Sequence, residues 1–291
     1  KKKDGGKTMK RNTVAFLNMK GGVCKTSLCK EIALYLSEVY QKKILVIDID
    51  PQSNCTQSFF ERYKIFSGEL ITDTSNIQSI QKIFSPSIGR LEKPSLDEII
   101  LQLSDNLHIV PGELETIFME RETASGVAEQ KLRNFIEDNQ LQESYDYILI
   151  DCPPTYSFYT ITALLATDLY LVPVTPDAYS LLGVNLLQEV IIHLKDNYKS
   201  SFREKPLDNL GIIFTKITKR PRTGIKNNMR QIKEAYADQN MPFFENSYLK
   251  ADKIATAKLS TFILDRKDEA LKENMKKICE EFISKVGEYN E

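Results

Sequence analysis

Residues 20–26 read Lys-Gly-Gly-Val-Cys-Lys-Thr, and this stretch determines the fold that we predict. It follows a short apolar run from Thr13 to Asn18 and precedes apolar residues at helical spacing up to Val39. Glycines allow backbone N–H groups to converge on phosphate oxygens, and the N-terminus of a helix adds the positive end of a dipole. A strand, a glycine turn and a helix in this order therefore predict a phosphate-binding loop.

Further apolar runs repeat this pattern along the chain. Lys43 to Asp48 is rich in β-branched residues, and similar runs occupy residues 107–110, 147–151, 169–173 and 210–215. Stretches with helical periodicity, such as 181–194, separate them. Continuous apolar strands that alternate with helices are typical of a parallel sheet covered on both faces. We therefore predict an α/β fold of three layers, with a mostly parallel central sheet between helices.

The chain is expected to form one domain behind a short leader. Residues 1–12 are predicted to be a flexible basic leader, and residues 13–291 a single domain, because 291 residues suit one large α/β domain or at most two. The polar stretch Ser67 to Ser95 is expected to be an elaborated connection within that domain. A last helix within Asp265 to Glu291 is expected to pack its apolar residues Leu271, Met275, Ile278 and Phe282 onto the body.

Composition and charge exclude several classes of protein. With 42% hydrophobic and 27% charged residues, the chain has an ordinary globular composition rather than a disordered or collagen-like one. Its 39 basic and 40 acidic residues give a net charge of −1, so any contact with DNA must come from a local patch. No apolar run reaches the roughly 18 to 20 residues of a membrane span, and no signal peptide is evident. The sequence predicts a cytoplasmic protein with no membrane partner.

Cysteine and histidine chemistry is not expected. The five cysteines, at positions 24, 29, 55, 152 and 279, form no C-x-x-C motif, which favours reduced thiols over disulfides or a zinc site. The two histidines, His108 and His193, each stand alone among apolar residues. Packed or surface histidines are the simpler interpretation.

The phosphate-binding loop supplies most of the candidate site residues. Lys25 is expected to reach the β- and γ-phosphates of a nucleotide, and the Thr26 hydroxyl to bind Mg²⁺. A plain G-x4-G-K-[ST] pattern fails here, because Met19 and Cys24 occupy its outer glycine positions. The predicted nucleotide-binding residues are Lys20, Gly21, Gly22, Val23, Cys24, Lys25, Thr26 and Ser27.

Two lysines five residues apart, Lys20 and Lys25, resemble the deviant Walker A motif K-G-G-x-x-K-[ST] of the ParA/MinD family of ATPases. The run Asp48-Ile-Asp-Pro-Gln52 resembles the D-x-D-P-Q of ParA proteins, and residues 147–154 resemble their Walker B segment. The resemblance continues through residues 106–112, 168–174 and 210–215, so it covers nearly everything after residue 12. It implies the P-loop NTPase fold and an ATPase most similar to ParA/Soj-type chromosome or plasmid partition proteins.

The resemblance also implies a role for each motif. Asp50 would be a catalytic residue that orients or polarises the attacking water, while a supporting role within the loop stays open for Asp48. Asp151 would hold Mg²⁺ through a coordinated water, beside Thr26 as the other metal-binding residue. Lys20, the other catalytic residue that the resemblance implies, would meet the nucleotide phosphates of a partner subunit. ATP would thus drive formation of a homodimer, with ATP and Mg²⁺ as cofactors and weak ATPase activity.

Position 24 departs from the family pattern, which has glycine there. One interpretation is that Cys24 is a tolerated small residue. The other is that the helix N-terminus and two lysines lower the pKa of the thiol, which would make ATP binding sensitive to oxidation.

DNA segregation is the favoured output of this ATPase. Seven of the eighteen residues from Lys216 to Lys233 are basic and none is acidic, although a solvated basic surface is the alternative. An ATP-bound dimer would hold non-specific DNA on the nucleoid, and a ParB-like partner would trigger hydrolysis. The candidate DNA-binding residues are Lys219, Arg220, Arg222, Lys226 and Arg230.

Two other outputs are less favoured. MinD relatives end in a basic amphipathic helix, whereas residues 265–291 hold six basic and eight acidic residues and would be repelled by an anionic membrane. A metabolic relative such as the nitrogenase iron protein would need cysteine pairs for an iron–sulfur cluster, and the cysteines here are scattered. The short stretch before the first strand also leads us to expect no N-terminal helix-turn-helix domain.

Overall fold

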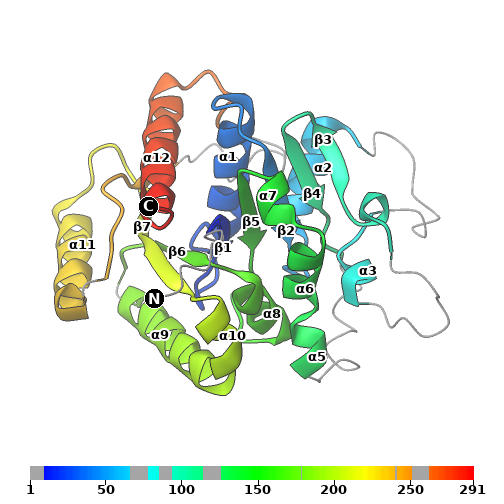
Figure 1. The fold of residues 1–291 in the computed structure, drawn as a ribbon. Helices are drawn as coiled ribbons and strands as arrows, with labels where there is room; N and C mark the ends of the chain where they lie inside the picture. Colours follow the sequence, from blue (N-terminus) through cyan, green and yellow to red (C-terminus); the bar gives the residue numbers. More distant parts are fainter. Residues whose placement is uncertain are drawn as a thin grey trace.

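A single mixed sheet runs through the centre of the molecule (Figure 1). The computed structural model describes residues 10–65, 78–84, 94–113, 126–177, 179–239, 241–250 and 262–291. Within these residues the sheet has eight strands in the order β3-β4-β2-β5-β1-β6-β7-β8. They are β1 (Thr13–Phe16), β2 (Ile44–Asp48), β3 (Leu101–Ser104), β4 (Leu107–Val110), β5 (Tyr147–Asp151), β6 (Leu169–Val174), β7 (Asp208–Ile217) and β8 (Tyr248–Leu249). Every pair of neighbours is parallel except β3 with β4.

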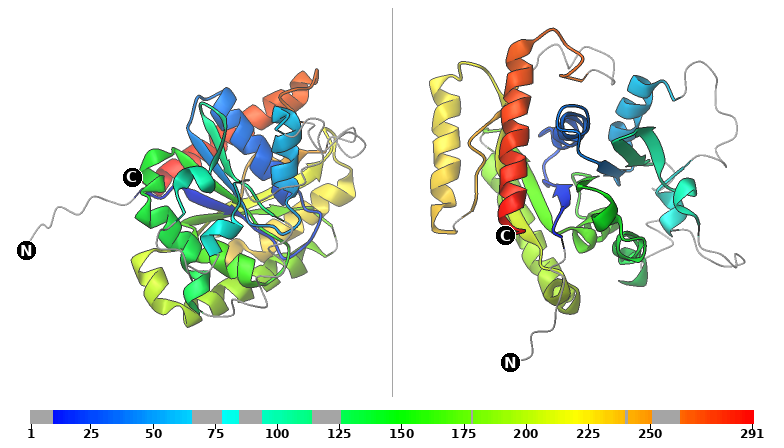
Figure 2. Two further views of the ribbon diagram at one scale, coloured as in Figure 1. Left: turned by 90° about the vertical axis from the view of Figure 1, so that its right-hand side faces the viewer. Right: turned by 45° about the horizontal axis from the view of Figure 1, so that its top comes forward.

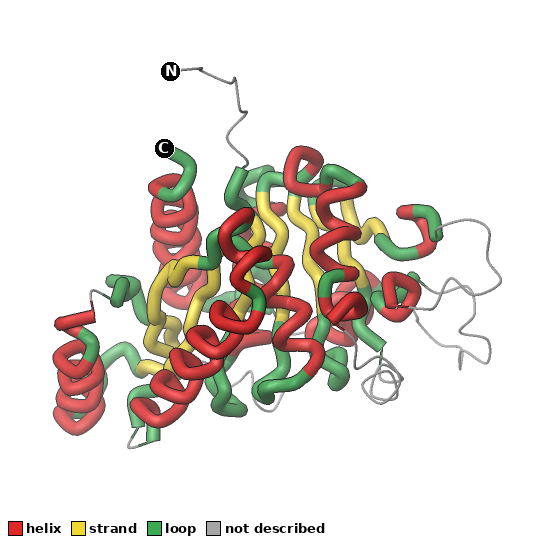
Figure 3. Tube along the Cα trace, turned by 60° about the horizontal axis from the view of Figure 1, so that its bottom comes forward, coloured by secondary structure: helices red, strands yellow, loops and turns green. Residues whose placement is uncertain are grey.

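Helices cover both faces of the sheet (Figures 1 and 3). One face carries α1 (Lys25–Glu38), α2 (Asn54–Tyr63) and α12 (Glu269–Glu288). The other carries α3 (Gln81–Phe84), α5 (Gly126–Glu129), α6 (Lys131–Asp138), α7 (Leu141–Ser144), α8 (Phe158–Ala166), α9 (Ser180–Asn197) and α10 (Lys199–Glu204). Two short 3₁₀ turns, η1 (Leu96–Glu98) and η3 (Ala237–Gln239), lie in connections.

The central strands are buried on both sides, which explains their continuous apolar sequences. Val14 and Phe16 of β1 belong to the core beneath α1 and α12, whereas Ala15 and the following Leu17 belong to the core beneath α8 and α9. All four side chains are inaccessible to solvent. Alternate residues of one strand thus fill two different cores. The predicted three-layer α/β fold is confirmed.

The edges of the sheet were not predicted. β3 turns back along β4 with a register shift, and β8 pairs with β7 over only two residues. Beyond β8 lies α11 (Thr223–Ala235), which stands at the margin of the molecule (Figure 2). Ile232 is its one buried residue. Short strands and a loosely covered margin leave little apolar periodicity for a sequence pattern to detect.

The expected last helix is present as α12. Leu271, Met275, Ile278 and Phe282 are buried in the core that α12 shares with α1, as predicted. The expected connection between Ser67 and Ser95 lies mostly outside the described residues. Among the described helices, none has both the length and the apolar character needed to cross a membrane.

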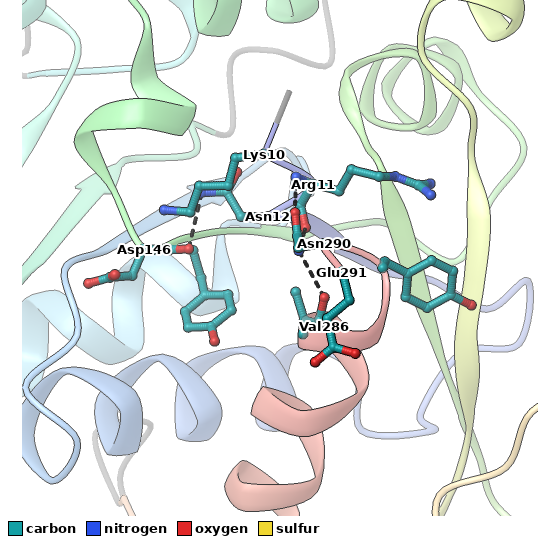
Figure 4. Close-up of a pocket in the computed structure, with 10 residues that line it drawn as sticks. Lys10, Arg11, Asn12, Asp146, Val286, Asn290 and Glu291 are labelled. Carbon is teal, nitrogen blue, oxygen red and sulfur yellow. Dashed lines mark hydrogen bonds between the residues drawn. The ribbon is translucent and has the colours of Figure 1, made fainter. Parts of the chain in front are cut away.

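Residues 10–12 differ from the expected flexible leader. The Asn12 side chain is buried and donates to the carbonyls of Gln142, Tyr145 and Asp146. The backbone N–H of Arg11 donates to Asn290 after α12 (Figure 4). The Lys10 side chain donates to the carbonyl of Tyr145. These residues therefore belong to the folded body, in a hollow at the amino ends of β1 and β5. Residues 1–9 of the expected leader lie outside the described residues.

Candidate functional site

The loop between β1 and α1 forms an open cradle. Gly22 has a φ of 71°, in the left-handed region, and the space where Cβ atoms would stand on Gly21 and Gly22 is empty to 4 Å. Helix α1 begins at Lys25, so its first N–H groups and its dipole face the same space. This geometry suits a phosphate group held by backbone donors.

The cradle opens into a cleft of about 440 Å³ at the carboxyl ends of the strands. Its lining brings together four separate segments: the loop itself, the turn after β2 with the start of α2, the turn after β5 and the end of β7. The lining residues are Gly21, Gly22, Val23, Cys24, Lys25, Thr26, Ser27, Asp50, Gln52, Asn54, Pro154 and Lys216. Of the predicted nucleotide-binding residues, all but Lys20 line this cleft. Lys25 and Asp50, which were predicted from two separate motifs, thus face the same cleft.

Lys25 is held at the base of the cleft with neutral acceptors. Its side-chain Nζ donates to the carbonyl oxygens of Asn18 at 3.2 Å and Lys20 at 3.3 Å. Burial lowers the pKa of Lys25, and the negative charges of Asp151 and Asp50 act in the opposite direction. Among the described residues, the hydrogen-bond acceptors of this buried cation are two carbonyl oxygens, so it is well placed to receive the charge of a phosphate.

Two carboxylates, Asp48 and Asp151, lie side by side beneath the cleft. They pair in register at the ends of β2 and β5, and both are inaccessible to solvent. Asp48 accepts hydrogen bonds from the Thr56 amide at 2.8 Å and its hydroxyl at 2.7 Å. Burial raises the pKa of Asp48 to about 7, although these donors from Thr56 oppose the shift. The role left open for Asp48 therefore has a structural basis, because it holds the start of α2 against the sheet.

Gly112 shows how closely the chain packs around Asp48. A Cβ at this glycine would lie 2.9 Å from the carbonyl oxygen of Asp48, so no larger residue fits without a shift. Its amide donates to the Thr56 hydroxyl at 2.8 Å, and that hydroxyl donates to Asp48. The β4 end, α2 and β2 are thereby joined in one hydrogen-bonded group.

Asp151 is less satisfied than Asp48. Neither carboxylate oxygen accepts a hydrogen bond of normal geometry from the described residues, although the Thr26 hydroxyl lies close enough to lower the pKa. Burial and the charge of Asp48 prevail and raise the pKa of Asp151 well above its ordinary value. A buried carboxylate without donors, next to a threonine hydroxyl, fits a site for a divalent cation. No group of three or more His, Cys, Asp or Glu in the described part of the chain could hold a metal alone. Phosphate oxygens and water would have to complete such a site.

Asp50 lies at the rim of the cleft. Its side chain is largely buried, and one oxygen accepts a hydrogen bond from the Gln52 amide at 2.9 Å. Its own amide donates to Asp48 at 3.3 Å. The turn after β2 therefore fixes the Asp50 carboxylate at the edge of the space that a phosphate would occupy.

Cys24 has the backbone conformation of a glycine. Its φ of 72° lies in the left-handed region, which explains why a glycine suits this position. The second interpretation of Cys24, a thiol of lowered pKa, is wrong. Burial raises the pKa of the thiol, and the charge of Lys216 and a hydrogen bond with Thr215 do not offset that effect. The thiol is therefore less reactive than a free cysteine rather than more reactive.

Lys20 is directed away from the cleft. Its Nζ lies 2.6 and 2.5 Å from the two carboxylate oxygens of Asp177, in the turn that leads into α9. Sequence reasoning missed Asp177. A single acid after Val174-Thr-Pro176 carries no motif signal, and only the fold brings it to Lys20, 157 positions earlier.

The predicted DNA-binding residues form one exposed segment. They lie on the turn after β7 and on α11, and all five are exposed to solvent. Lys219 is 3.9 Å from Asp268, and Arg230 is 3.7 Å from Glu234, so these two have acidic neighbours. Within the described residues, no ion pair involves Arg220, Arg222 or Lys226. Asn228 of the same helix donates to the carbonyl of Pro176, beside Asp177.

Comparison with known proteins gives a consistent picture at the level of family. A family model described as an AAA domain matches residues 11–204. An uncharacterized protein of Methanocaldococcus jannaschii is 31% identical over 224 residues, covering 77% of this chain and 80% of that protein. The sporulation initiation inhibitor protein Soj of Bacillus subtilis is 27% identical over 227 residues, covering 78% of this chain and 80% of Soj.

Solved structures share the fold at lower sequence identity. The ATP complex of a Cyanothece McdA variant superposes with a TM-score of 0.73 at 19% identity, covering 94% of this chain and 96% of that one. A plasmid partition protein from Borrelia burgdorferi gives a TM-score of 0.67 at 22% identity, covering 95% and 100% of the two chains. The fold of this chain is thus a known architecture.

Proposed function

This chain belongs to the ParA/MinD family of AAA-domain P-loop ATPases, and from that premise we propose that it is a ParA-type partition ATPase. In this proposal the subunit binds ATP with Mg²⁺, dimerises and holds non-specific DNA. A ParB-like partner then stimulates hydrolysis, and the DNA is released. The basal ATPase rate is expected to be weak.

The observation that carries the proposal is the cleft above the buried carboxylates. Backbone donors of the phosphate loop, the Lys25 ammonium and the Asp50 carboxylate all face it. Thr26 and Asp151 would hold Mg²⁺, which, when bound, neutralises charge on the β- and γ-phosphates. This donor set suits a nucleoside triphosphate better than a neutral ligand.

The chain's own residues would act mainly by position and charge. Lys25 would exchange its carbonyl acceptors for phosphate oxygens, which gives a buried ammonium a charged partner. Asp50 would orient the attacking water from the rim of the cleft, where the turn after β2 already fixes its carboxylate. Lys20 would serve the nucleotide of the partner subunit. Phosphoryl transfer requires little more of a protein than this arrangement.

The exposed basic segment supports DNA as the ligand of the ATP-bound form. Arg220, Arg222 and Lys226 are exposed and have no ion pair with the described residues, and a near-neutral protein needs such a local patch to bind DNA. Because DNA would exchange counterions for these side chains, its retention should fall steeply with salt.

A MinD-like positioning ATPase and a metabolic deviant-Walker ATPase are the alternatives. The apolar face of α12 is buried against α1, so this helix has no free apolar face for a membrane surface. Four of the five cysteines are buried within the subunit, away from any surface where two copies could share a cluster. Both observations favour the partition proposal.

DNA co-sedimentation with ATP, ADP or no nucleotide tests the proposal. We expect the protein to be retained on DNA with ATP but not with ADP or without nucleotide. Replacing Arg220, Arg222 and Arg230 together by Glu should lower this retention and make it depend less on salt concentration. A matched control replaces Lys267, Lys276 and Lys277, which are exposed around α12, by Glu. The charge change is the same, so retention in the control should stay close to that of the unaltered protein. Equal loss of DNA retention in both variants would contradict the assignment of DNA binding to this segment. Retention that is the same with ATP, ADP and no nucleotide would contradict the proposed ATP dependence.

A further inference from the structure

The turn that leads into α9, together with the first turn of that helix, forms a seat for the Lys20 side chain. Both carboxylate oxygens of Asp177 contact the ammonium, at 2.5 and 2.6 Å. Gly183, one turn into α9, faces the Lys20 stem, and a Cβ on this glycine would lie 3.3 Å from the Lys20 Cβ. The Lys20 amide donates to the Asn18 side chain at 2.9 Å, which fixes the backbone below. The amide, the Cβ and the ammonium of Lys20 therefore each have a neighbour in the fold.

Asp177 is itself fixed in place. It accepts hydrogen bonds from the Tyr179 amide and the Ser180 hydroxyl, both at 3.0 Å. The single proton of the Ser180 hydroxyl is shared between Asp177 and the carbonyl of Thr175, and the Asp177 amide donates to the Ser180 oxygen, so the turn is closed on itself. Burial tends to raise the pKa of Asp177, but the hydrogen bonds from Lys20, Tyr179 and Ser180 prevail and lower it. The carboxylate is thus a prepared, charged acceptor rather than a chance neighbour.

The seat removes Lys20 from the place where the proposed function needs it. The Lys20 side chain does not line the phosphate cleft of its own subunit, and its charge is already paired. To bridge to the phosphates of a second subunit, the ammonium has to leave Asp177. Two such pairs must open for each dimer that forms.

We propose that Asp177 is a positioning residue that locks Lys20 within its own subunit and thereby opposes dimerisation until a triphosphate competes for the ammonium. This proposal rests on the proposed function, because it assumes that Lys20 serves the partner's nucleotide. Asp177 carries one negative charge, whereas a bound triphosphate presents several, so the exchange favours the dimer only when the nucleotide is present. The Asp177 side chain is 42% exposed, and water can solvate it once Lys20 has left.

The size of the lock follows from its exposure. A partly exposed ion pair contributes a factor of about 2 to 5 to an equilibrium. Since two pairs open per dimer, removing the lock should strengthen dimerisation by about 4- to 25-fold. A lock of this strength adjusts the nucleotide threshold without preventing the switch.

Sedimentation velocity across a series of AMPPNP concentrations tests the proposal on the full chain. Asp177→Asn keeps an acceptor for the Tyr179 amide while it removes the charge, and we expect it to dimerise at a several-fold lower AMPPNP concentration. Asp177→Glu restores a carboxylate and should return the threshold close to that of the unaltered protein. Asp196→Asn, on the exposed far end of α9, is the matched control for charge and should leave the threshold unchanged. Asp177→Ser replaces Asp177→Asn if the latter does not fold.

The salt dependence of the AMPPNP threshold distinguishes an electrostatic lock by Asp177 from a purely structural role of this residue. The difference between Asp177→Asn and the unaltered protein should shrink as salt rises, because screening already weakens the ion pair. A threshold that is unchanged or higher in Asp177→Asn overturns the lock. If the unaltered protein stays monomeric at saturating AMPPNP while Asp177→Asn dimerises, the lock stands and the proposed threshold is simply high. If neither dimerises, the proposed function fails at its dimer step and the lock fails with it.

Discussion

At the scale of single residues, Cys24 shows a conflict between side chain and backbone. A residue with a Cβ at φ 72° costs about 1 kcal/mol or more, and glycine avoids this cost but gains entropy in the unfolded chain. We expect Cys24→Gly to be between neutral and about 1 kcal/mol more stable in urea unfolding, with nucleotide binding retained. Cys24→Ala removes the thiol but keeps the Cβ, so it should show no such gain. A Gly variant that is less stable than the Ala variant would mean that the backbone strain at this position is smaller than the entropy that glycine adds to the unfolded chain.

Asp151 gives a prediction with a defined pH dependence. Its folded-state pKa is raised above the unfolded value of about 3.9, so the unfolded chain releases the proton first and stability falls as pH rises above that value. Asp151→Asn removes this penalty. Without nucleotide, its melting temperature should exceed that of the unaltered protein by several degrees at pH 8, corresponding to about 1 to 3 kcal/mol.

Calorimetry at two pH values checks this prediction. The gain from Asp151→Asn should be smaller at pH 5, where the unaltered protein keeps more of its proton. ATPase activity should be lost at both values, because the variant lacks the carboxylate. A gain that is independent of pH would mean that the charge of Asp151 is not the source of the penalty.

The residues that line the cleft could be predicted from the sequence more readily than the residues that position them. Lys25, Thr26 and Asp50 stand in local motifs, because a phosphate loop and a strand-end acid are built from consecutive positions. Asp177 carries no local pattern, since it acts on Lys20, 157 positions away. Gly112 lies in a segment that resembles the family, but its close approach to Asp48 is visible only in the fold. The backbone conformation of Cys24 could be expected only as a departure from glycine, and the direction of its pKa shift depends on burial that no sequence pattern shows.

At the scale of elements, continuous apolar runs located the central strands. The predicted bounds agree to within one residue with those of β2, β4, β5 and β6. Strands that are buried on both faces have continuous apolar sequences, which makes their bounds easy to recognise. β7 extends two residues beyond the prediction at each end, where its side chains become more exposed or its neighbour changes. β3 and β8 were missed, because an edge strand of two to four residues has too few buried positions.

The attachment of α11 can be tested as an element. Only Ile232 of this helix is buried, and the Asn228 side chain donates to the carbonyl of Pro176 at 3.1 Å. Asn228→Ala should loosen the helix, because a hydrogen bond contributes about 0.5 to 1.5 kcal/mol. We expect amide hydrogen exchange in α11 to quicken by about 2- to 10-fold. Asn227→Ala, at the exposed neighbouring position, is the control and should exchange at the original rate.

At the scale of the whole molecule, the two ends of the sheet have different roles: one carries the candidate site and the other joins the two ends of the described chain. Its carboxyl ends hold the phosphate cleft and the Lys20 seat, whereas its amino ends join residues 10–12 to the end of α12 (Figure 4). β7 continues from this sheet into the turn that carries the basic segment. The hydrogen bond from Asn228 to the carbonyl of Pro176 joins α11 to the turn that holds Asp177.

Nucleotide linkage tests the whole assembly. AMPPNP at about 100 times its dissociation constant should stabilise the protein by about 2.7 kcal/mol, which raises the melting temperature by roughly 5 to 10 °C. If dimers form, this shift should also grow with protein concentration, because dissociation accompanies unfolding. Lys20→Ala should keep a shift but lose its dependence on protein concentration, whereas Lys25→Ala should lose the shift itself. Differential scanning fluorimetry over a roughly 100-fold range of protein concentration measures these melting temperatures. Only a shift that includes dimer dissociation should depend on protein concentration. A shift in the unaltered protein that ignores its own concentration would mean that nucleotide binds to single subunits, and the role of Lys20 across a dimer would then be wrong.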